Sequence, residues 1–331
     1  MKPLLEVKNL ETSFFTQRGE VQALRGVSFS VEQGEIVGLI GESGCGKSVT
    51  ALSIMRLLSS RGRVKAGEIL FKGQDLLHLS DREMEKLRGQ QIAMVFQDSM
   101  VSLNPVFTIG AQMEELLRYH KGMGKAEARQ RVLELLGMVG IPEPEKRIGD
   151  YPHQLSGGQR QRVCIAMALS CEPELLLADE PTTALDVTIQ AQILDLIRNL
   201  AEKLSTSVVL VTHDLGVIAN TCSRVVVMYG GQIMEQGCVE DIFDQPLHPY
   251  TRGLLKTILE LNGRGQEELF CMEGFPPPLL NPPKGCPFAQ RCPHAMRICV
   301  EQAPGVFGTA AHYARCYLLD KACPAAGGNV W

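Results

Sequence analysis

The chain has 331 residues, a net charge of −4, 45% apolar residues and 21% charged residues. This composition describes a soluble globular protein of about two domains, and the acidic balance excludes a general attraction to nucleic acid or anionic lipid. No apolar run approaches the roughly 18 residues that cross a bilayer, and the N-terminus lacks a signal-peptide core. We therefore expect the chain to remain in the cytoplasm, with any membrane contact confined to a local surface.

The N-terminal residues alternate between apolar and polar types, as strands do. Two such runs, at 4–10 and 21–31, predict an antiparallel hairpin, and residues 67–71 predict another short strand. Phe14 follows the first run. Its ring is suited either to stacking on a flat base such as adenine or to packing in the core, and the pattern fits both alternatives equally.

A phosphate-loop motif, G-x-x-x-x-G-K-S, follows the apolar run at 35–40 and precedes a helical pattern that begins at Val49. The motif reads Gly41-Glu42-Ser43-Gly44-Cys45-Gly46-Lys47-Ser48. Between a strand and a helix, its glycines let backbone N–H groups point at the phosphates of a nucleotide. Lys47 adds a full positive charge at the β- and γ-phosphates, and the Ser48 hydroxyl is a Mg²⁺ ligand. The motif predicts that the chain binds a nucleoside triphosphate.

Polar side chains also follow two later apolar runs. Residues 92–96 lead to Gln97, where a polar side chain would face the nucleotide, and residues 175–178 lead to Asp179-Glu180. Adjacent carboxylates at the end of an apolar strand are costly unless a cation or a reaction needs them. Asp179 is suited to the Mg²⁺ shell and Glu180 to the polarisation of an attacking water.

Between these runs the pattern changes from strands to helices. Residues 99–155 contain helical stretches broken by prolines, which predict an inserted helical subdomain. The segment Leu155-Ser156-Gly157-Gly158-Gln159 then opens a helix whose small residues make a second anion site without a lysine. A later apolar run at 208–211 leads to His213, and the strand–helix order brings this histidine to the same ligand edge.

Together these motifs resemble the ordered motif set of ABC ATPases over residues 1–242. The resemblance is carried by the phosphate loop, Gln97, the signature at 155–159, Asp179-Glu180, Ala184-Leu185-Asp186 and His213. It implies an α/β fold in which an ABC-type phosphate-loop ATPase core carries an antiparallel β subdomain and the inserted helical subdomain. A small Cys-rich C-terminal region follows this core.

The resemblance also implies how ATP and Mg²⁺ are bound and used. The nucleotide-binding residues of the loop are then Ser43, Gly44, Cys45, Gly46, Lys47, Ser48 and Val49, with Phe14 in the adenine position, where many relatives have Tyr. Mg²⁺ is held by Ser48, Gln97 and Asp179. Glu180 is the general base, and His213 contacts the γ-phosphate. Two such domains face each other head to tail, so Ser156, Gly157, Gly158 and Gln159 contact the nucleotide of a second, related ATPase subunit, and Asp186 communicates across the dimer.

Three further segments are similar to the ATPases of dipeptide and oligopeptide importers: residues 96–105, 181–192 and 246–251. Ser99 stands where those relatives commonly have Pro, and Val101 where they have Thr. The similarity implies two transmembrane permease subunits as partners, docked around residues 97–105 at the cytoplasmic face of the membrane. An extracytoplasmic peptide-binding protein acts through these permeases. Similar subunits handle nickel complexes or glutathione, which remain alternative substrates.

Four of the eleven cysteines cluster in the C-terminal extension, residues 243–331: Cys286, Cys292, Cys299 and Cys316. Four thiolates ligate either zinc or an iron–sulfur cluster, and this spacing lacks the paired C-x-x-C knuckles of a zinc ribbon. Because peptide-importer ATPases with this tail resemble proteins that carry a [4Fe-4S] cluster, we expect such a cluster with a structural role. Zinc is the alternative.

A competing class of function is a non-transport ABC ATPase that acts on DNA or ribosomes. Such proteins usually carry a long coiled coil between the nucleotide motifs, or two cassettes in one chain. Here a compact segment separates Lys47 from Ser156, and the chain has one cassette. The composition also lacks the basic excess of a nucleic-acid-binding protein. We therefore expect no nucleic-acid partner.

Overall fold

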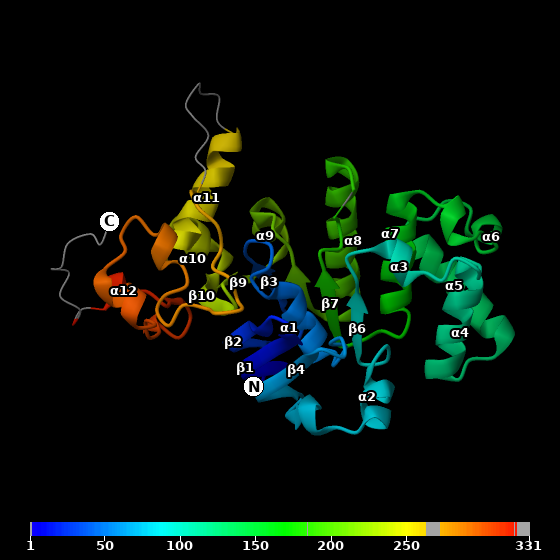
Figure 1. Cartoon of the computed structure of the whole chain (residues 1–331). Coiled ribbons are helices and arrows are strands. Elements are labelled where there is room, and N and C mark those ends of the chain that lie inside the picture. Colours follow the sequence, from blue (N-terminus) through cyan, green and yellow to red (C-terminus); the bar gives the residue numbers. More distant parts are fainter. Residues whose placement is uncertain (1, 184, 263–271, 321, 323–331) are drawn as a thin grey trace. The chain divides into compact units, whose positions relative to one another are not determined.

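The computed structural model describes residues 2–183, 185–262, 272–320 and 322 (Figure 1). The chain divides into two compact units. The first combines residues 1–30, 37–77 and 212–331, and the second combines residues 31–36 and 78–211. The domain boundary expected near residue 242 stays a prediction, because the first unit contains residues on both sides of it.

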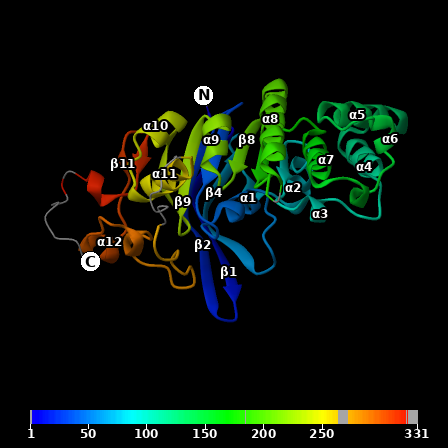
Figure 2. The ribbon, with the colours of Figure 1, turned by 90° about the horizontal axis from the view of Figure 1, so that it is seen from above.

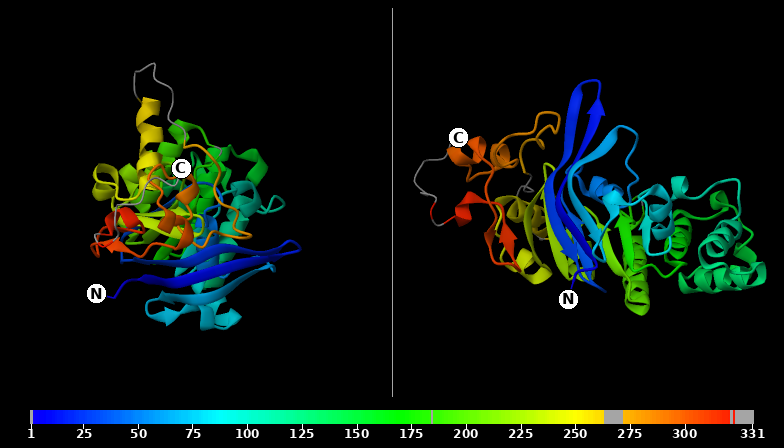
Figure 3. Two further views of the ribbon diagram at one scale, coloured as in Figure 1. Left: turned by 60° about the vertical axis from the view of Figure 1, so that its left-hand side comes forward. Right: turned by 90° about the horizontal axis from the view of Figure 1, so that it is seen from below.

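The first unit contains an N-terminal antiparallel sheet. Its strands are β1 (Leu5–Thr16), β2 (Gly19–Val31), β4 (Gly62–Phe71) and β5 (Gln74–Asp75), in the order β2-β1-β4-β5. β1 runs antiparallel to β4, with Leu5 opposite Phe71, and the long blue strands lie beside β4 in Figure 3. The predicted pairing of the two N-terminal runs is confirmed, since β1 and β2 are neighbours.

A second group of strands in the first unit positions the phosphate loop. It comprises β3 (Ile36–Ile40), β9 (Arg224–Tyr229), β10 (Gln232–Cys238), β11 (Phe307–Gly308) and β12 (Tyr313–Ala314), in the order β11-β12-β10-β9-β3. β3 is parallel to β9, whereas β10 is antiparallel to both β9 and β12. The C-terminal region is therefore hydrogen-bonded to the strand group that carries the phosphate loop.

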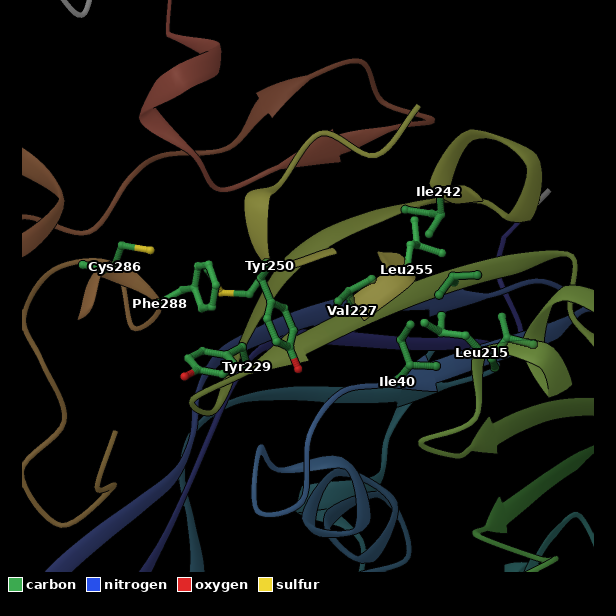
Figure 4. Close-up of a cluster of buried hydrophobic side chains, with 13 residues drawn as sticks. Ile40, Leu215, Val227, Tyr229, Ile242, Tyr250, Leu255, Cys286 and Phe288 are labelled. Carbon is green, nitrogen blue, oxygen red and sulfur yellow. The ribbon is translucent and has the colours of Figure 1, made fainter. Parts of the chain in front are cut away.

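Helices and the C-terminal region complete the first unit. They are α1 (Lys47–Ile54), α9 (Leu215–Thr221), α10 (Val239–Asp244), α11 (Pro249–Asn262), α12 (Arg297–Glu301) and the short 3-10 helices η1 (Leu76–His78), η3 (Ala289–Arg291) and η4 (Tyr317–Leu319). Residues from β3, β9, α9, α11 and the C-terminal region share one buried hydrophobic cluster, drawn in Figure 4. Burial of apolar area is the main force that stabilises such a cluster.

The second unit contains three successive parallel strands, β6 (Ile92–Val95), β7 (Leu175–Asp179) and β8 (Ser207–Val211), with Ile92 beside Leu175 and Leu175 beside Ser207. Every residue of β7 and β8 is buried. Their nearly continuous apolar runs are typical of strands covered on both faces. The helices α2 (Asp81–Leu87), α7 (Gly157–Leu169) and α8 (Val187–Leu204) belong to the same unit.

The segment predicted to be helical contains α3 (Ser99–Ser102), α4 (Ile109–Lys121), α5 (Lys125–Met138), α6 (Pro144–Arg147) and the 3-10 helix η2 (Pro152–Gln154). α4, α5 and α6 lie together in Figure 2. Met113 and Leu117 of α4 and Val132 and Leu136 of α5 are fully buried, so the two longer helices are held by their apolar faces. Within the described residues, no helix combines the length and apolar character that a bilayer span requires.

Candidate functional site

The phosphate loop connects β3 to α1 in the first unit, as the motif predicts. Gly46 precedes α1 with φ 109° and Gly41 follows β3 with φ 149°. A side chain at Gly41 would collide with the Met228 carbonyl and the Cys45 sulfur, and one at Gly46 would collide with Leu24. Both positions therefore need glycine for space as well as for backbone conformation.

Lys47 begins α1 and is only 5% exposed. Its Nζ donates to the carbonyl oxygens of Gly41 (2.7 Å) and Glu42 (3.1 Å). Burial raises the pKa of the neighbouring Cys45, so this thiol is a neutral packing group. The ammonium group of Lys47 is thus held over the start of the loop, where a polyphosphate would meet it.

Glu42, the second residue of the loop, is hydrogen-bonded to residues of the C-terminal region. Its backbone N–H donates to the Tyr250 hydroxyl (2.9 Å), and its carboxylate accepts two hydrogen bonds from Arg291 (3.0 and 2.8 Å). The motif leaves this position open to any residue. Sequence reasoning therefore assigned no role to Arg291, which is 249 positions away.

Three aromatic rings link the loop to the C-terminal region. The ring centroids of Tyr229 and Tyr250 are 4.6 Å apart, and Phe288 lies 5.4 Å from Tyr229 and 5.3 Å from Tyr250. Figure 4 shows these rings grouped, with Cys286 on the far side of Phe288. Such rings bury a large area in a specific geometry, so they fix the C-terminal region against the strand β9 beside the loop.

Cys286, Cys292, Cys299 and Cys316 line one cavity, together with residues that include His248 and His294. Burial raises the pKa of Cys286 to about 12 and of Cys316 to about 11, and it also raises the pKa of Cys292. Among the described residues, no group of three or more histidine, cysteine, aspartate or glutamate side chains is arranged to hold a metal ion. The four thiols thus share a cavity, but in the described part of the chain they are not arranged as a metal site.

In the second unit, β7 ends at Asp179 and is followed by Glu180, as expected. Asp179 is 6% exposed at the end of the strand. The Glu180 carboxylate accepts hydrogen bonds from Gln97 Nε2 (3.1 Å) and from Thr183 Oγ1 (2.9 Å). Glu180 also has φ 45°, a left-handed conformation that is strained for a side chain of this kind. The structure thus brings together Gln97 and Glu180, which were predicted separately.

Ser156 caps α7 with a reciprocal pair of hydrogen bonds. Its hydroxyl accepts from the Gln159 N–H (3.3 Å), and the Gln159 side chain accepts from the Ser156 N–H (3.0 Å). Gly157 and Gly158 form the first turn of the helix. N–H groups in a first turn lack acceptors within the helix, so this end is suited to an anion.

The remaining predicted residues lie on both units. In the first, His213 is exposed, and Phe14 is half-buried in β1 opposite Gly62. In the second, Asp186 precedes α8 and is exposed. Ala184, from the same expected motif, lies outside the described residues.

An exposed apolar patch surrounds α3 in the second unit. Its members are Phe96, Met100, Val101, Val106 and Phe107, with Val101 83% exposed. Large exposed apolar groups in one short segment are typical of a protein-contact surface. This patch overlaps residues 97–105, the segment expected to dock on membrane subunits.

Comparisons with known proteins give consistent matches along the chain. Residues 24–183 match the family model of the ABC transporter, and residues 234–299 match that of the oligopeptide/dipeptide transporter C-terminal region. The chain is 54% identical over 323 residues to the oligopeptide transport ATP-binding protein OppD of Bacillus subtilis (strain 168), covering 97% of this chain and 90% of that protein. It is also 54% identical over 325 residues to the dipeptide transport ATP-binding protein DppD of the same strain, covering 97% and 96%.

Solved structures agree with these sequence matches. The ATP-binding cassette MJ0796, in a dimeric post-hydrolysis state bound to ADP and Pi, matches with a TM-score of 0.64 and 32% sequence identity. The match covers 71% of this chain and 98% of that one.

Proposed function

The chain belongs to the ATP-binding subunits of oligopeptide and dipeptide ABC transporters, and from this premise we propose how its residues bind ATP, hydrolyse it and couple it to import. It has the ABC ATPase cassette fold, and it couples ATP hydrolysis to peptide transport. The observation that carries this function is 54% identity over nearly the whole chain to subunits of both kinds.

The phosphate loop binds ATP. The backbone N–H groups of residues 43–49 surround the phosphates, and the Lys47 ammonium neutralises the β- and γ-oxygens. The Ser48 hydroxyl and the Asp179 carboxylate, with Gln97, are Mg²⁺ ligands. The buried Lys47 and the glycines required at positions 41 and 46 support this role, because they fix the conformation of the loop without a bound ligand. Phe14 stacks on the adenine.

Glu180 is the general base that orients the attacking water, and His213 contacts the γ-phosphate. The hydrogen bonds from Gln97 and Thr183 to one oxygen of Glu180 support its role, because they hold the carboxylate in a single orientation. Gln97 also lies in the segment that carries the exposed apolar patch. It thereby links the base to the membrane contact.

The ATPase acts as a dimer with a second, related subunit. Ser156, Gly157, Gly158 and Gln159 contact the nucleotide of that partner, and Asp186 lies at the contact between the subunits. The dimeric state of the similar cassette bound to ADP and Pi supports this arrangement. The capped, glycine-rich start of α7 supplies the N–H groups.

Two transmembrane permeases are the membrane partners, and the exposed apolar patch around α3 is the docking surface for them. The chain is then a peripheral protein at the cytoplasmic face of the membrane. An extracytoplasmic peptide-binding protein delivers the substrate to the permeases.

Cys286, Cys292, Cys299 and Cys316 hold a [4Fe-4S] cluster. Their shared cavity supports the donor set, since four cysteines are the usual ligands of such a cluster. Zinc is the alternative occupant of the same four thiolates. When bound, the cluster cross-links these segments of the C-terminal extension and stabilises its fold.

The transport substrate is tested by isolating the complex with its permeases and binding protein. Mass spectrometry of the ligand released from the binding protein is expected to identify peptides of a few residues. ATP hydrolysis by the reconstituted complex should rise when that peptide-loaded binding protein is added. A nickel complex or glutathione as the released ligand, with no response to peptides, would overturn the peptide assignment.

A further inference from the structure

We propose that Arg291 is a positioning residue for ATP binding, because it neutralises and anchors Glu42 in the phosphate loop from the C-terminal region. The inference rests on the proposed function of that loop. By this inference the C-terminal extension contributes to the affinity of the phosphate loop for ATP.

Arg291 is fixed by acceptors on several segments. Besides the two Glu42 oxygens, it donates to the Tyr229 hydroxyl (3.0 Å) and to the carbonyl oxygens of Met272 (3.1 Å) and Glu273 (2.9 Å). Its side chain is 7% exposed and that of Glu42 is 23% exposed. Exposed pairs contribute little because water screens them and both side chains must be ordered. This pair is shielded and already ordered, so its charges act strongly on their surroundings.

The position of Arg291 is set by the cysteine-containing segment. It ends η3, between Cys286 and Cys292, and its N–H donates to the Phe288 carbonyl (3.0 Å). Its guanidinium lies 5.7 Å from the ring centroid of Tyr229 and 6.0 Å from that of Phe288, within the range of cation–π contacts. Folding of the segment around the four cysteines therefore places the guanidinium on the loop.

The position of Arg291 affects ATP affinity through Glu42. A carboxylate at the second position of a phosphate loop repels the polyphosphate unless a cation compensates it. Lys47 donates to the backbone carbonyl of Glu42, whereas Arg291 donates to both of its carboxylate oxygens. Loss of Arg291 leaves a partly buried negative charge beside the ligand, and ATP affinity falls.

The test uses the full chain assembled with its partner ATPase and permeases. Arg291→Ala should raise the KM for ATP by about tenfold, because the charge of Glu42 is then uncompensated, while kcat changes by less than about twofold. Arg297→Ala is the matched control, since it removes an exposed arginine–glutamate pair in the same region, with Glu301. It should leave KM unchanged. A KM for Arg291→Ala equal to that of wild type, or an equal rise in the control, would overturn the proposal.

A second substitution separates charge compensation from a merely structural role. Adding Glu42→Gln to Arg291→Ala should return KM to within about threefold of wild type, and Glu42→Gln alone should not raise KM. A double variant as weak as Arg291→Ala would contradict the electrostatic account. If Arg291→Ala fails to fold, Arg291→Lys and Glu42→Gln decide the matter: the lysine variant should keep a near-normal KM because it keeps the charge, and a tenfold rise would refute the proposal.

The outcome for Lys47→Ala keeps the two proposals distinguishable. If that variant binds ATP as wild type does, the proposed nucleotide site itself fails. If Lys47→Ala loses ATP and Arg291→Ala does not, only the inference about Arg291 fails.

Discussion

Gln97 Nε2 donates a hydrogen bond of 3.1 Å to the Glu180 carboxylate, across 83 positions of sequence. Thr183 Oγ1 donates to the same oxygen at 2.9 Å. These two bonds fix one oxygen of the carboxylate. The other oxygen is thereby given a defined direction, which is what a base that orients water requires.

Replacement of Glu180, the proposed general base, should separate ATP binding from hydrolysis. Glu180→Gln keeps the shape of the side chain and loses its charge, so ATP affinity should stay near normal while turnover falls by about 10²- to 10⁴-fold. Single-turnover hydrolysis and equilibrium nucleotide binding check this. Glu202→Gln, at an exposed position of α8, is the control and should keep full activity. Retention of more than about a tenth of wild-type turnover by Glu180→Gln would refute the assignment.

The start of α7 is predicted to act on the nucleotide of the partner subunit. Ser156→Glu should therefore abolish ATP hydrolysis by the assembled complex, because a carboxylate there repels the partner's polyphosphate. ATP binding by the isolated chain should be unaffected. Ser80→Glu is a matched control, since Ser80 caps α2 with the same type of capping box. Equal loss of activity in both variants would show a folding defect and argue against the dimer role.

The cysteine-lined cavity is predicted to hold about four irons and four sulfides after anaerobic purification. Substituting Ser for Cys286, Cys292, Cys299 or Cys316 should remove the iron and its visible absorption, and should make the C-terminal region sensitive to protease. Cys238→Ser is the control, because Cys238 caps α10 and serine is a good capping residue. Stoichiometric zinc without iron in the anaerobic protein would reject the cluster.

Gly285 is predicted to be needed for the arrangement of the cysteines. A side chain there would collide with the carbonyl oxygens of Cys299 and Val300, next to the hydrogen bond from the Cys286 N–H to the Cys299 carbonyl (2.7 Å). Gly285→Ala should cost about 1–3 kcal/mol, as overpacking does, and should lower iron content. Gly305→Ala meets nothing closer than 3.8 Å and should change neither quantity. Thermal unfolding and iron analysis measure both effects, and a Gly285→Ala protein with wild-type values would disprove the prediction.

Much of the fold follows from local patterns that the chain carries in sequence. The pairing of β1 with β2 and the apolar strands β7 and β8 were predicted and are present. Strand periodicity and caps are properties of a few neighbouring residues, so a sequence reveals them directly. The boundaries shifted by a few residues, as with β4, which begins at Gly62 rather than at residue 67, because tertiary pairing extends a strand beyond its apolar run.

The phosphate loop was readable from sequence for the same reason. Its chemistry needs particular residue types at fixed spacing along one stretch of chain, so Lys47 and Ser48 are recognisable without any structure. The clustering of Cys286, Cys292, Cys299 and Cys316 was also visible, since they lie close together in sequence. Their shared cavity is a tertiary result.

Only the tertiary structure decided which distant side chains meet. Arg291 and Glu42 are separated by 249 positions and belong to no common motif, and the motif allows any residue at the position of Glu42. Their ion pair exists because Phe288 packs on Tyr229 and Tyr250, which sets η3 beside the loop. Packing of a hydrophobic cluster depends on the whole fold, and no local pattern along the chain records its result.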